Sequence, residues 1–288
     1  MCNTKVCLLI TSIFLALSFF WTDTLIEILQ PGTVVFYRSL FAMITIGILL
    51  LFQRKFVYRN LPWGLFLGFG IFNFFIPWIS LSYGLKYLPV TVVIVIETLL
   101  FFLSVILIFV FKKVQHKKFR YTLIGSYAFV FFTLIFILLS FFALDGLGVL
   151  LIILGACSMV FALQVYNPFF QALSASIVIF GSLLWVTPIA FIFMMETSPG
   201  TSKYIFDVNV MIPLLFLGII SSGLIQICYR NILKVKGRTY DYIMRFIVVF
   251  IIFAISACLN DMKNILIYLI VLFFIGVGSM IFIKKEIV

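Results

Sequence analysis

The stretch KGRTYDYIMRFIVV, residues 236–249, leads from a basic loop into an apolar run that continues to Leu259 and carries two ions inside it. A charge in the middle of a membrane helix costs about 2.5–3.5 kcal/mol on insertion scales, so such a residue faces a partner or a wet cavity rather than lipid. The polar residues here recur at helical spacing and therefore share one helix face, which we expect to turn inward. They are Arg238, Asp241, Tyr242 and Arg245.

The composition of the whole chain is that of a membrane protein with several spans. Of its 288 residues, 65% are hydrophobic and only 10% are charged, whereas ordinary globular chains are about 45–50% apolar and about 25% charged. The apolar excess must face lipid. The net charge of +11 does not indicate nucleic-acid binding, because the basic residues crowd short loops and no soluble basic domain accompanies them.

Ten apolar runs, each near the roughly 20 residues that cross a bilayer, predict about ten transmembrane helices and an all-α polytopic fold. We number them segments 1 to 10, approximately 6–26, 33–52, 63–84, 89–111, 121–142, 147–166, 175–195, 210–229, 239–259 and 264–283. With the N-terminus inside, only Lys86, Lys203 and Lys263 fall in outer loops. By the positive-inside rule, both termini are therefore cytoplasmic.

An internal repeat divides the chain into two predicted halves of five helices each, residues 1–143 and 144–288. The sequence LFLG at 65–68 recurs at 215–218, and the pair Leu-Lys at 85–86 recurs at 233–234. With five helices per half, the second half enters the membrane from the opposite side. Inverted repeats of this kind are typical of transporters, whose binding site lies near the midplane between the halves. The register places Glu97 of segment 4 opposite Arg245 of segment 9.

Glu97 and Arg245 are the main candidates for contacts to a substrate. From a rise of about 1.5 Å per residue, we expect them on opposite sides of the midplane, on the order of 9 Å apart along the membrane normal. That separation suits either a stretched arginine that pairs with the glutamate or a solute that bridges them. Three roles are open for Glu97: a structural ion pair, a substrate contact, or a carboxyl group that takes up and releases a proton.

Further polar residues predict either a cavity lining or helix-packing surfaces. Asn73 and Ser80 lie on segment 3, Gln226 and Tyr229 lie on the equivalent segment 8, and Tyr242 shares the face of Arg245. Three ions have predicted structural or gating roles. Asp241 can pair with Arg245 on its own helix, whereas Arg38 lies near the outer end of segment 2, where Asp23 of segment 1 predicts an ion cluster.

Three stretches resemble the drug/metabolite transporter superfamily, specifically its ten-helix EamA-type members. They are PGTVVFYRSLFAMI at 31–44, SLSYGLKYLPVTVVIVIETLLFFLSVIL at 80–107 and KKVQHKKFRYTLIGSYAFVF at 112–131. The chain departs from the family in lacking proline in the middle of segments 4 and 9. The resemblance implies a bundle in which segments 3, 4, 8 and 9 surround a central cavity, in a bacterial inner membrane. It also implies amino acids or nucleoside-like solutes such as S-adenosylmethionine as cargo.

We therefore predict a transporter of small polar organic metabolites that works by alternating access in the lipid bilayer, with possible proton or counter-solute coupling. The alternative is a flippase for lipid or polyprenyl carriers, which the very apolar segments favour. An integral membrane enzyme would need a catalytic cluster at one interface. The five cysteines lack metal-ligand spacing and the one histidine, His116, lies in a basic loop, so we expect no metal, no cofactor and no enzymatic activity.

Overall fold

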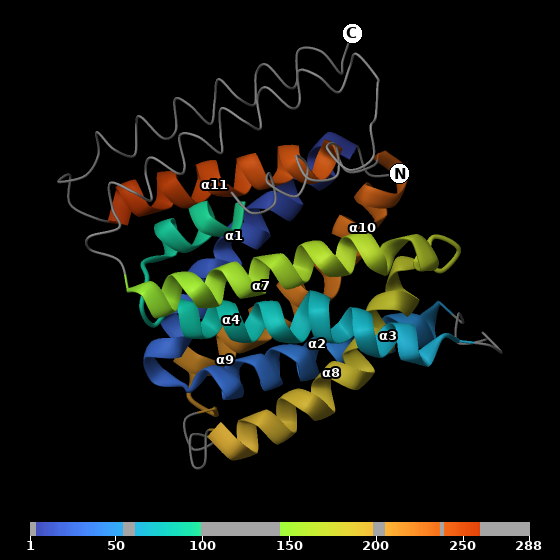
Figure 1. Ribbon diagram of the computed structural model, residues 1–288, viewed down its shortest axis with the longest axis horizontal. Coiled ribbons are helices and arrows are strands. Elements are labelled where there is room, and N and C mark those ends of the chain that lie inside the picture. Colours follow the sequence, from blue (N-terminus) through green and yellow to red (C-terminus); the bar gives the residue numbers. More distant parts are fainter. Residues whose placement is uncertain (1–3, 54–60, 99–144, 198–204, 237–238, 260–288) are drawn as a thin grey trace, which may run out of the picture.

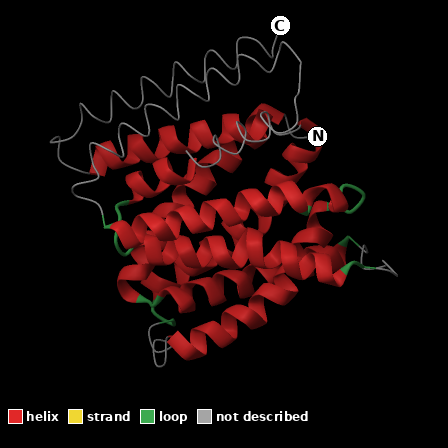
Figure 2. Cartoon of the chain, in the orientation of Figure 1, coloured by secondary structure: helices red, strands yellow, loops and turns green. Residues whose placement is uncertain are grey.

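The computed structural model describes residues 4–53, 61–98, 145–197, 205–236 and 239–259, and within these ranges every long regular element is a helix (Figures 1 and 2). Segments 1 and 2 are α1 (Thr4–Ile28) and α2 (Pro31–Phe52). Segment 3 comprises α3 (Trp63–Gly70), η1 (Ile71–Phe75) and α4 (Ile76–Gly84), and segment 4 is helical from residue 90 to the end of its described part at 98.

The second half repeats this pattern. Segments 6 and 7 are α7 (Gly146–Val165) and α8 (Ala175–Thr197), joined through the short 3₁₀ helix η3 (Asn167–Phe170). Segment 8 comprises α9 (Val208–Leu215), η5 (Phe216–Leu224) and α10 (Ile225–Lys236), and segment 9 is α11 (Thr239–Leu259). Segments 5 and 10, predicted at 121–142 and 264–283, lie outside the described residues.

Local chemistry explains where these helices begin. Pro31 lies in the first turn of α2, where its missing N–H costs nothing. The carboxylates of Asp145 and Asp207 accept hydrogen bonds from the backbone N–H groups of Leu147 and Asn209, at 2.9 and 3.0 Å, and so cap α7 and α9. Proline and aspartate thus mark where these three helices begin.

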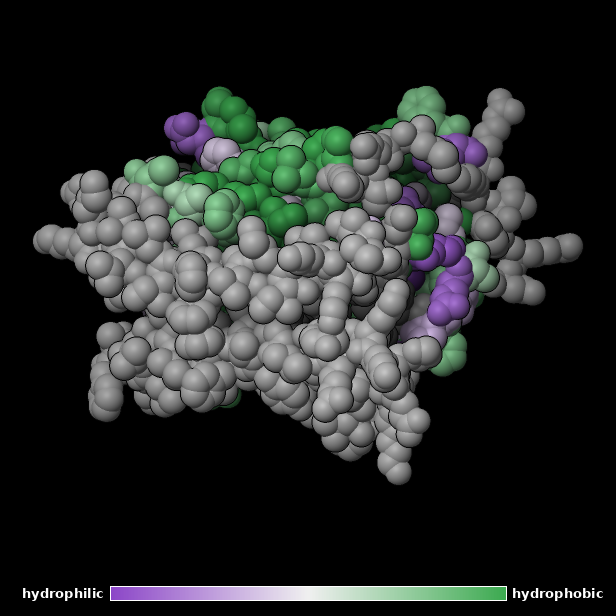
Figure 3. Space-filling model, turned by 90° about the horizontal axis from the view of Figure 1, so that it is seen from above, coloured by the Kyte–Doolittle hydropathy of each residue, from purple (hydrophilic) through white to green (hydrophobic). Residues whose placement is uncertain are grey.

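Among the described residues, six helical stretches are long and apolar enough to cross a membrane: Val6–Ile28, Pro31–Phe52, Trp63–Gly84, Gly146–Val165, Ala175–Thr197 and Val208–Val235. In the view of Figure 1, α2, α4 and α7 run in nearly the same direction, whereas α1 and the stretch from α9 to α10 cross it obliquely. Where described residues are visible from above, apolar side chains occupy the middle of the molecule and hydrophilic ones lie near its two ends (Figure 3). The molecule is therefore a helical polytopic membrane protein, as its composition predicts.

Segments 3 and 8 share an irregularity that the sequence does not reveal. Each changes from α-helix to π-helix near its middle, at η1 and η5 respectively. A π-helical turn adds a residue to the helical repeat and often occurs at functional sites. It also offsets the residues before it from those after it, so α-helical spacing cannot be continued through either segment.

Glycines allow segments 3 and 8 to approach their neighbours closely. A Cβ atom on Gly70 would come within 2.8 Å of the Ser182 carbonyl oxygen in α8, and one on Gly218 would collide with Phe41 in α2. Two large apolar clusters form around these contacts, one centred on α1, the described part of segment 4 and α11, the other on α2, segment 3 and α8. The candidate site lies where the two clusters meet.

Candidate functional site

A cavity of about 100 Å³ lies at the centre of the described bundle. Segments 3, 4, 8 and 9 all contribute to its lining, as the family resemblance implies, and α1, α2 and α7 contribute as well. Much of the lining is apolar, including Phe19, Ile94, Ile152 and Val248.

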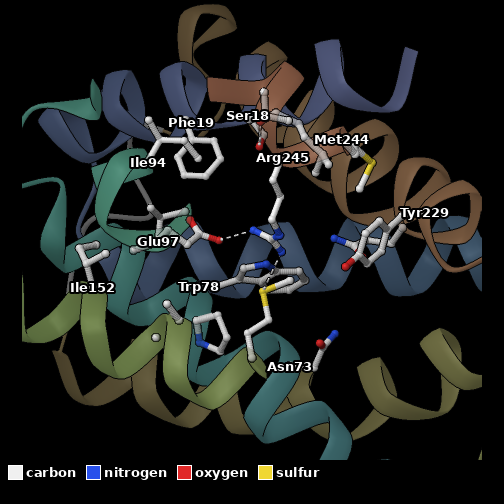
Figure 4. Close-up of a pocket in the computed structure, with 18 of the residues that line it drawn as sticks. Ser18, Phe19, Asn73, Trp78, Ile94, Glu97, Ile152, Tyr229, Met244 and Arg245 are labelled. Carbon is white, nitrogen blue, oxygen red and sulfur yellow. Dashed lines mark hydrogen bonds and ion pairs between the residues drawn. The ribbon is translucent and has the colours of Figure 1, made fainter. Parts of the chain in front are cut away.

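Glu97 and Arg245 meet inside this cavity (Figure 4). The Nη1 atom of Arg245 lies 3.4 Å from the Oε1 atom of Glu97, and the two side chains are only 10% and 18% exposed. The Nη2 atom of Arg245 also lies 3.9 Å from the sulfur of Met159 in α7. The long arginine side chain thus spans the separation along the membrane normal that helical rise predicts, and Arg245 and Glu97 pair directly.

Arg38 lies in the same cavity, which differs from the prediction of an outer ion cluster with Asp23. Its side chain is 4% exposed, its Nε atom donates a hydrogen bond of 2.6 Å to the Ser222 hydroxyl, and its guanidinium carbon lies 4.6 Å from the centre of the Trp78 ring. Among the described residues, Asp23 forms no ion pair with it. The predicted cluster is therefore wrong for Arg38.

The reason lies in the face of α2 that carries Arg38. Its face is the buried one, shared with Ser39, Ala42 and Ile46. That pattern of small and apolar residues at helical spacing is the signal in the sequence that could have placed Arg38 inside.

Three predicted substrate-binding residues, Asn73, Gln226 and Tyr229, line the cavity. Asn73 is 7% exposed, and its Oδ1 atom has no hydrogen-bond partner among the described residues. Ser80 lies elsewhere: it is buried at the contact between α4 and α7, where a Cβ atom on Gly155 would come within 2.8 Å of the Ser80 Cβ. Asn73 lies within η1 and Ser80 lies in the α-helix that follows, so α-helical spacing does not hold between them, which explains why they separate.

The side chains of Tyr242 and Asp241 lie outside the described residues, so their predicted contacts to substrate and to Arg245 stay predictions. Asp23 is half-buried on α1. Sequence reasoning missed Ser18 and Phe19 of α1 and Met159 of α7 as lining residues, because an apolar or small residue beside a cavity has the same sequence pattern as one in a packed core.

A smaller hollow adjoins the cavity along segment 8. The two share Asn73, Gln226 and Tyr229, and the hollow continues to Arg230. The guanidinium carbon of Arg230 lies 5.2 and 5.6 Å from the ring centres of Phe69 and Phe170. Polar side chains therefore extend from the central cavity toward the Lys236 end of segment 8.

Comparison with known proteins agrees with this geometry. The model of the EamA-like transporter family matches residues 4–139, which confirms the resemblance to the drug/metabolite transporter superfamily. No curated protein matches the chain. One solved crystal structure has a similar fold, with a TM-score of 0.59, 14% sequence identity and 96% of both chains covered. The protein is thus an integral membrane protein, and the family match indicates a transporter of the drug/metabolite type.

Proposed function

We propose that this membrane transporter carries a small polar organic metabolite, such as an amino acid or a nucleoside-like solute, by alternating access between two inverted five-helix halves. The observation that carries the proposal is the Glu97–Arg245 ion pair. One partner comes from each proposed half, and the two meet at 3.4 Å within one central cavity. Buried ions inside a membrane protein mark substrate or ion pathways.

The packing of the helices supports two related halves. Segment 3 packs on segment 6 through α4 and α7, and its counterpart segment 8 packs on segment 1 through η5 and α10. Segments 2 and 7, which are each other's counterparts, pack together as α2 and α8. The π-helical stretches η1 and η5 also occur in counterpart segments. Exchange of the two halves therefore maps these contacts onto one another, as an inverted repeat requires.

The ion pair suggests how a charged solute could enter the cavity and release the contact between the two proposed halves. With no solute present, Glu97 and Arg245 neutralise each other across the cavity. A solute with a cationic and an anionic group can replace both partners, so that each charge keeps a counter-charge while the direct bridge between the halves is released. Rocking of the halves then exposes the solute on the other side. Proton or counter-solute coupling can act on the same pair.

The cavity volume agrees with a closed form. Ligand pockets usually measure about 300–1,000 Å³, whereas this cavity measures about 100 Å³. A nucleoside-like cargo therefore requires a more open form than this one. We further propose that the protein resides in a bacterial inner membrane with both termini in the cytoplasm, because that orientation places most lysines and arginines inside.

Uptake of labelled amino acids and nucleosides into liposomes that contain the purified protein tests the proposal. We expect Glu97→Gln and Arg245→Gln to abolish uptake, whereas Glu196→Gln, which removes an exposed carboxylate at the end of α8, leaves it unchanged. The double variant Glu97→Arg with Arg245→Glu separates binding from structure. It restores an ion pair of reversed polarity, so we expect recovered thermal stability without recovered uptake. Full uptake by the double variant would mean that the pair is only structural.

A further inference from the structure

The described lining of the central cavity carries more positive than negative charge. Arg38 and Arg245 both line it, and Glu97 is the one carboxylate among the described lining residues. Glu97 forms the ion pair with Arg245, and its charge also acts on Arg38. The described lining carboxylate is thus bonded to Arg245, whereas Arg38 has no carboxylate bonded to it among the described residues.

Arg38 is held by neutral partners that fix its position without cancelling its charge. Its Nε atom donates to the Ser222 hydroxyl at 2.6 Å, and its guanidinium lies over the Trp78 ring at 4.6 Å. A guanidinium carries five N–H donors, arranged in a planar fork that matches a carboxylate. The hydrogen bond to Ser222 uses one of them. The others have no acceptor among the described residues and are available to an anion in the cavity.

Asn73 offers a second polar group that lacks a partner. It is 7% exposed, lines the cavity, and its Oδ1 atom accepts no hydrogen bond within the described part of the chain. A buried acceptor without a donor is costly, so a cargo that carries a hydroxyl or N–H group would satisfy it. The remaining wall includes Phe19, Ile94 and Ile152, which are apolar.

We propose that the cavity selects a small organic acid with a net charge of about −1, whose carboxylate binds the N–H fork of Arg38 and whose apolar body packs on the wall formed by Phe19, Ile94 and Ile152. This inference rests on the proposed function: it keeps the transport of a small polar organic metabolite, and it assigns an organic acid bound at Arg38 in place of the amino acid or nucleoside-like solute given there as examples. The planar N–H fork of Arg38, which has no bonded carboxylate among the described residues, favours a monocarboxylate over a phosphate dianion. It also disfavours a cation, which would meet two guanidinium groups.

A matched set of four-carbon probes tests the charge preference at a size that suits the cavity. The set is butyrate, butyramide, butylamine and the zwitterion 2-aminobutyrate, each added to the purified full-length protein at equal ionic strength. A ligand that binds the folded form raises the melting temperature with its concentration. We expect butyrate to raise it, and the three other probes to have at least tenfold weaker apparent affinity.

Variants at Arg38 assign the effect to the cavity. Arg38→Gln should abolish the butyrate shift, Arg38→Lys should retain part of it because the charge remains without the fork, and Ser222→Ala should retain most of it. A butyrate shift that persists in Arg38→Gln, an equal shift with butyramide or 2-aminobutyrate, or no shift with butyrate would each overturn the inference.

Liposome uptake separates failure of this inference from failure of the proposed function. If a neutral or zwitterionic solute is taken up and Glu97→Gln abolishes that uptake, the proposed function stands and the preference for a net anion is wrong. If butyrate stabilises the protein through Arg38 but no solute of any charge is taken up, the anion site stands and the transport role of the cavity fails.

Discussion

Arg38 and Arg245 are two buried guanidinium groups in one cavity, and the protein holds them in opposite ways. On the α11 side, Arg245 pairs with a carboxylate from the other proposed half of the chain. On the α2 side, Arg38 lies between a hydroxyl and an aromatic ring, with no carboxylate bonded to it among the described residues. The first arrangement joins the two proposed halves, whereas the second leaves N–H donors of Arg38 without an acceptor among the described residues.

The largest effect is expected from Arg245→Gln. Removal of one partner of a buried ion pair leaves the other charge uncompensated, which costs about 3–5 kcal/mol. Thermal unfolding of the purified protein should show a clear drop in melting temperature. The double variant Glu97→Gln with Arg245→Gln should recover much of that loss, because neither charge then remains. A single variant as stable as the native protein would show that the pair contributes little to the fold.

Gly218→Ala tests the packing that positions Arg38. A Cβ atom on Gly218 would collide with Phe41 and come within 3.2 Å of the Arg38 carbonyl oxygen, so α2 must move away from segment 8. Overpacking of this kind costs about 1–3 kcal/mol. The matched control is Gly64→Ala in α3, where an added Cβ meets nothing within 4 Å. Equal melting temperatures for both variants would contradict the close contact between α2 and segment 8.

A smaller effect on stability is expected from Arg38→Gln. The glutamine amide can still bond to Ser222, and the substitution removes a charge that has no bonded carboxylate among the described residues. The free energy of unfolding of the ligand-free protein should therefore fall by less than about 1 kcal/mol, or rise, because replacing a poorly compensated buried charge is often neutral or stabilising. Thermal unfolding measures this change. A loss as large as that of Arg245→Gln would mean that Arg38 also has a structural counter-charge.

The sequence was sufficient for the features that depend on local patterns. Apolar runs and their proline and aspartate breaks predicted the described helices, and the register of the repeat singled out Glu97 and Arg245, which the structure pairs. The direction in which Arg38 points was harder to predict: it lies on the buried face of α2 with Ala42 and Ile46, which places it in the cavity rather than in the predicted outer cluster.

The π-helical stretches mark the limit of reasoning from helical spacing. The sequence left Asn73 and Ser80 open alike as cavity lining or helix packing, and η1, which contains Asn73, interrupts the α-helical spacing between them. A π-helical turn depends on how neighbouring helices pack around it, and here Gly70 directly before η1 lies against the backbone of Ser182. Because these contacts join residues that are distant in the sequence, no local sequence pattern predicts the π-helical turn.

The smallest effect is expected from Ser80→Ala, which therefore sets the baseline for the comparison between the two arginines. Ser80 packs against Gly155 between α4 and α7, both of which contribute other residues to the cavity wall. Alanine keeps the Cβ atom that makes this contact, so uptake and the butyrate shift should both remain within about twofold of the native values. Asn73→Ala, on the same segment, should reduce uptake more than Ser80→Ala, because Asn73 lines the cavity. If Ser80→Ala instead abolished uptake while Asn73→Ala did not, the working face of segment 3 would be the one that follows uninterrupted α-helical spacing, and the offset produced by η1 would have no bearing on the site.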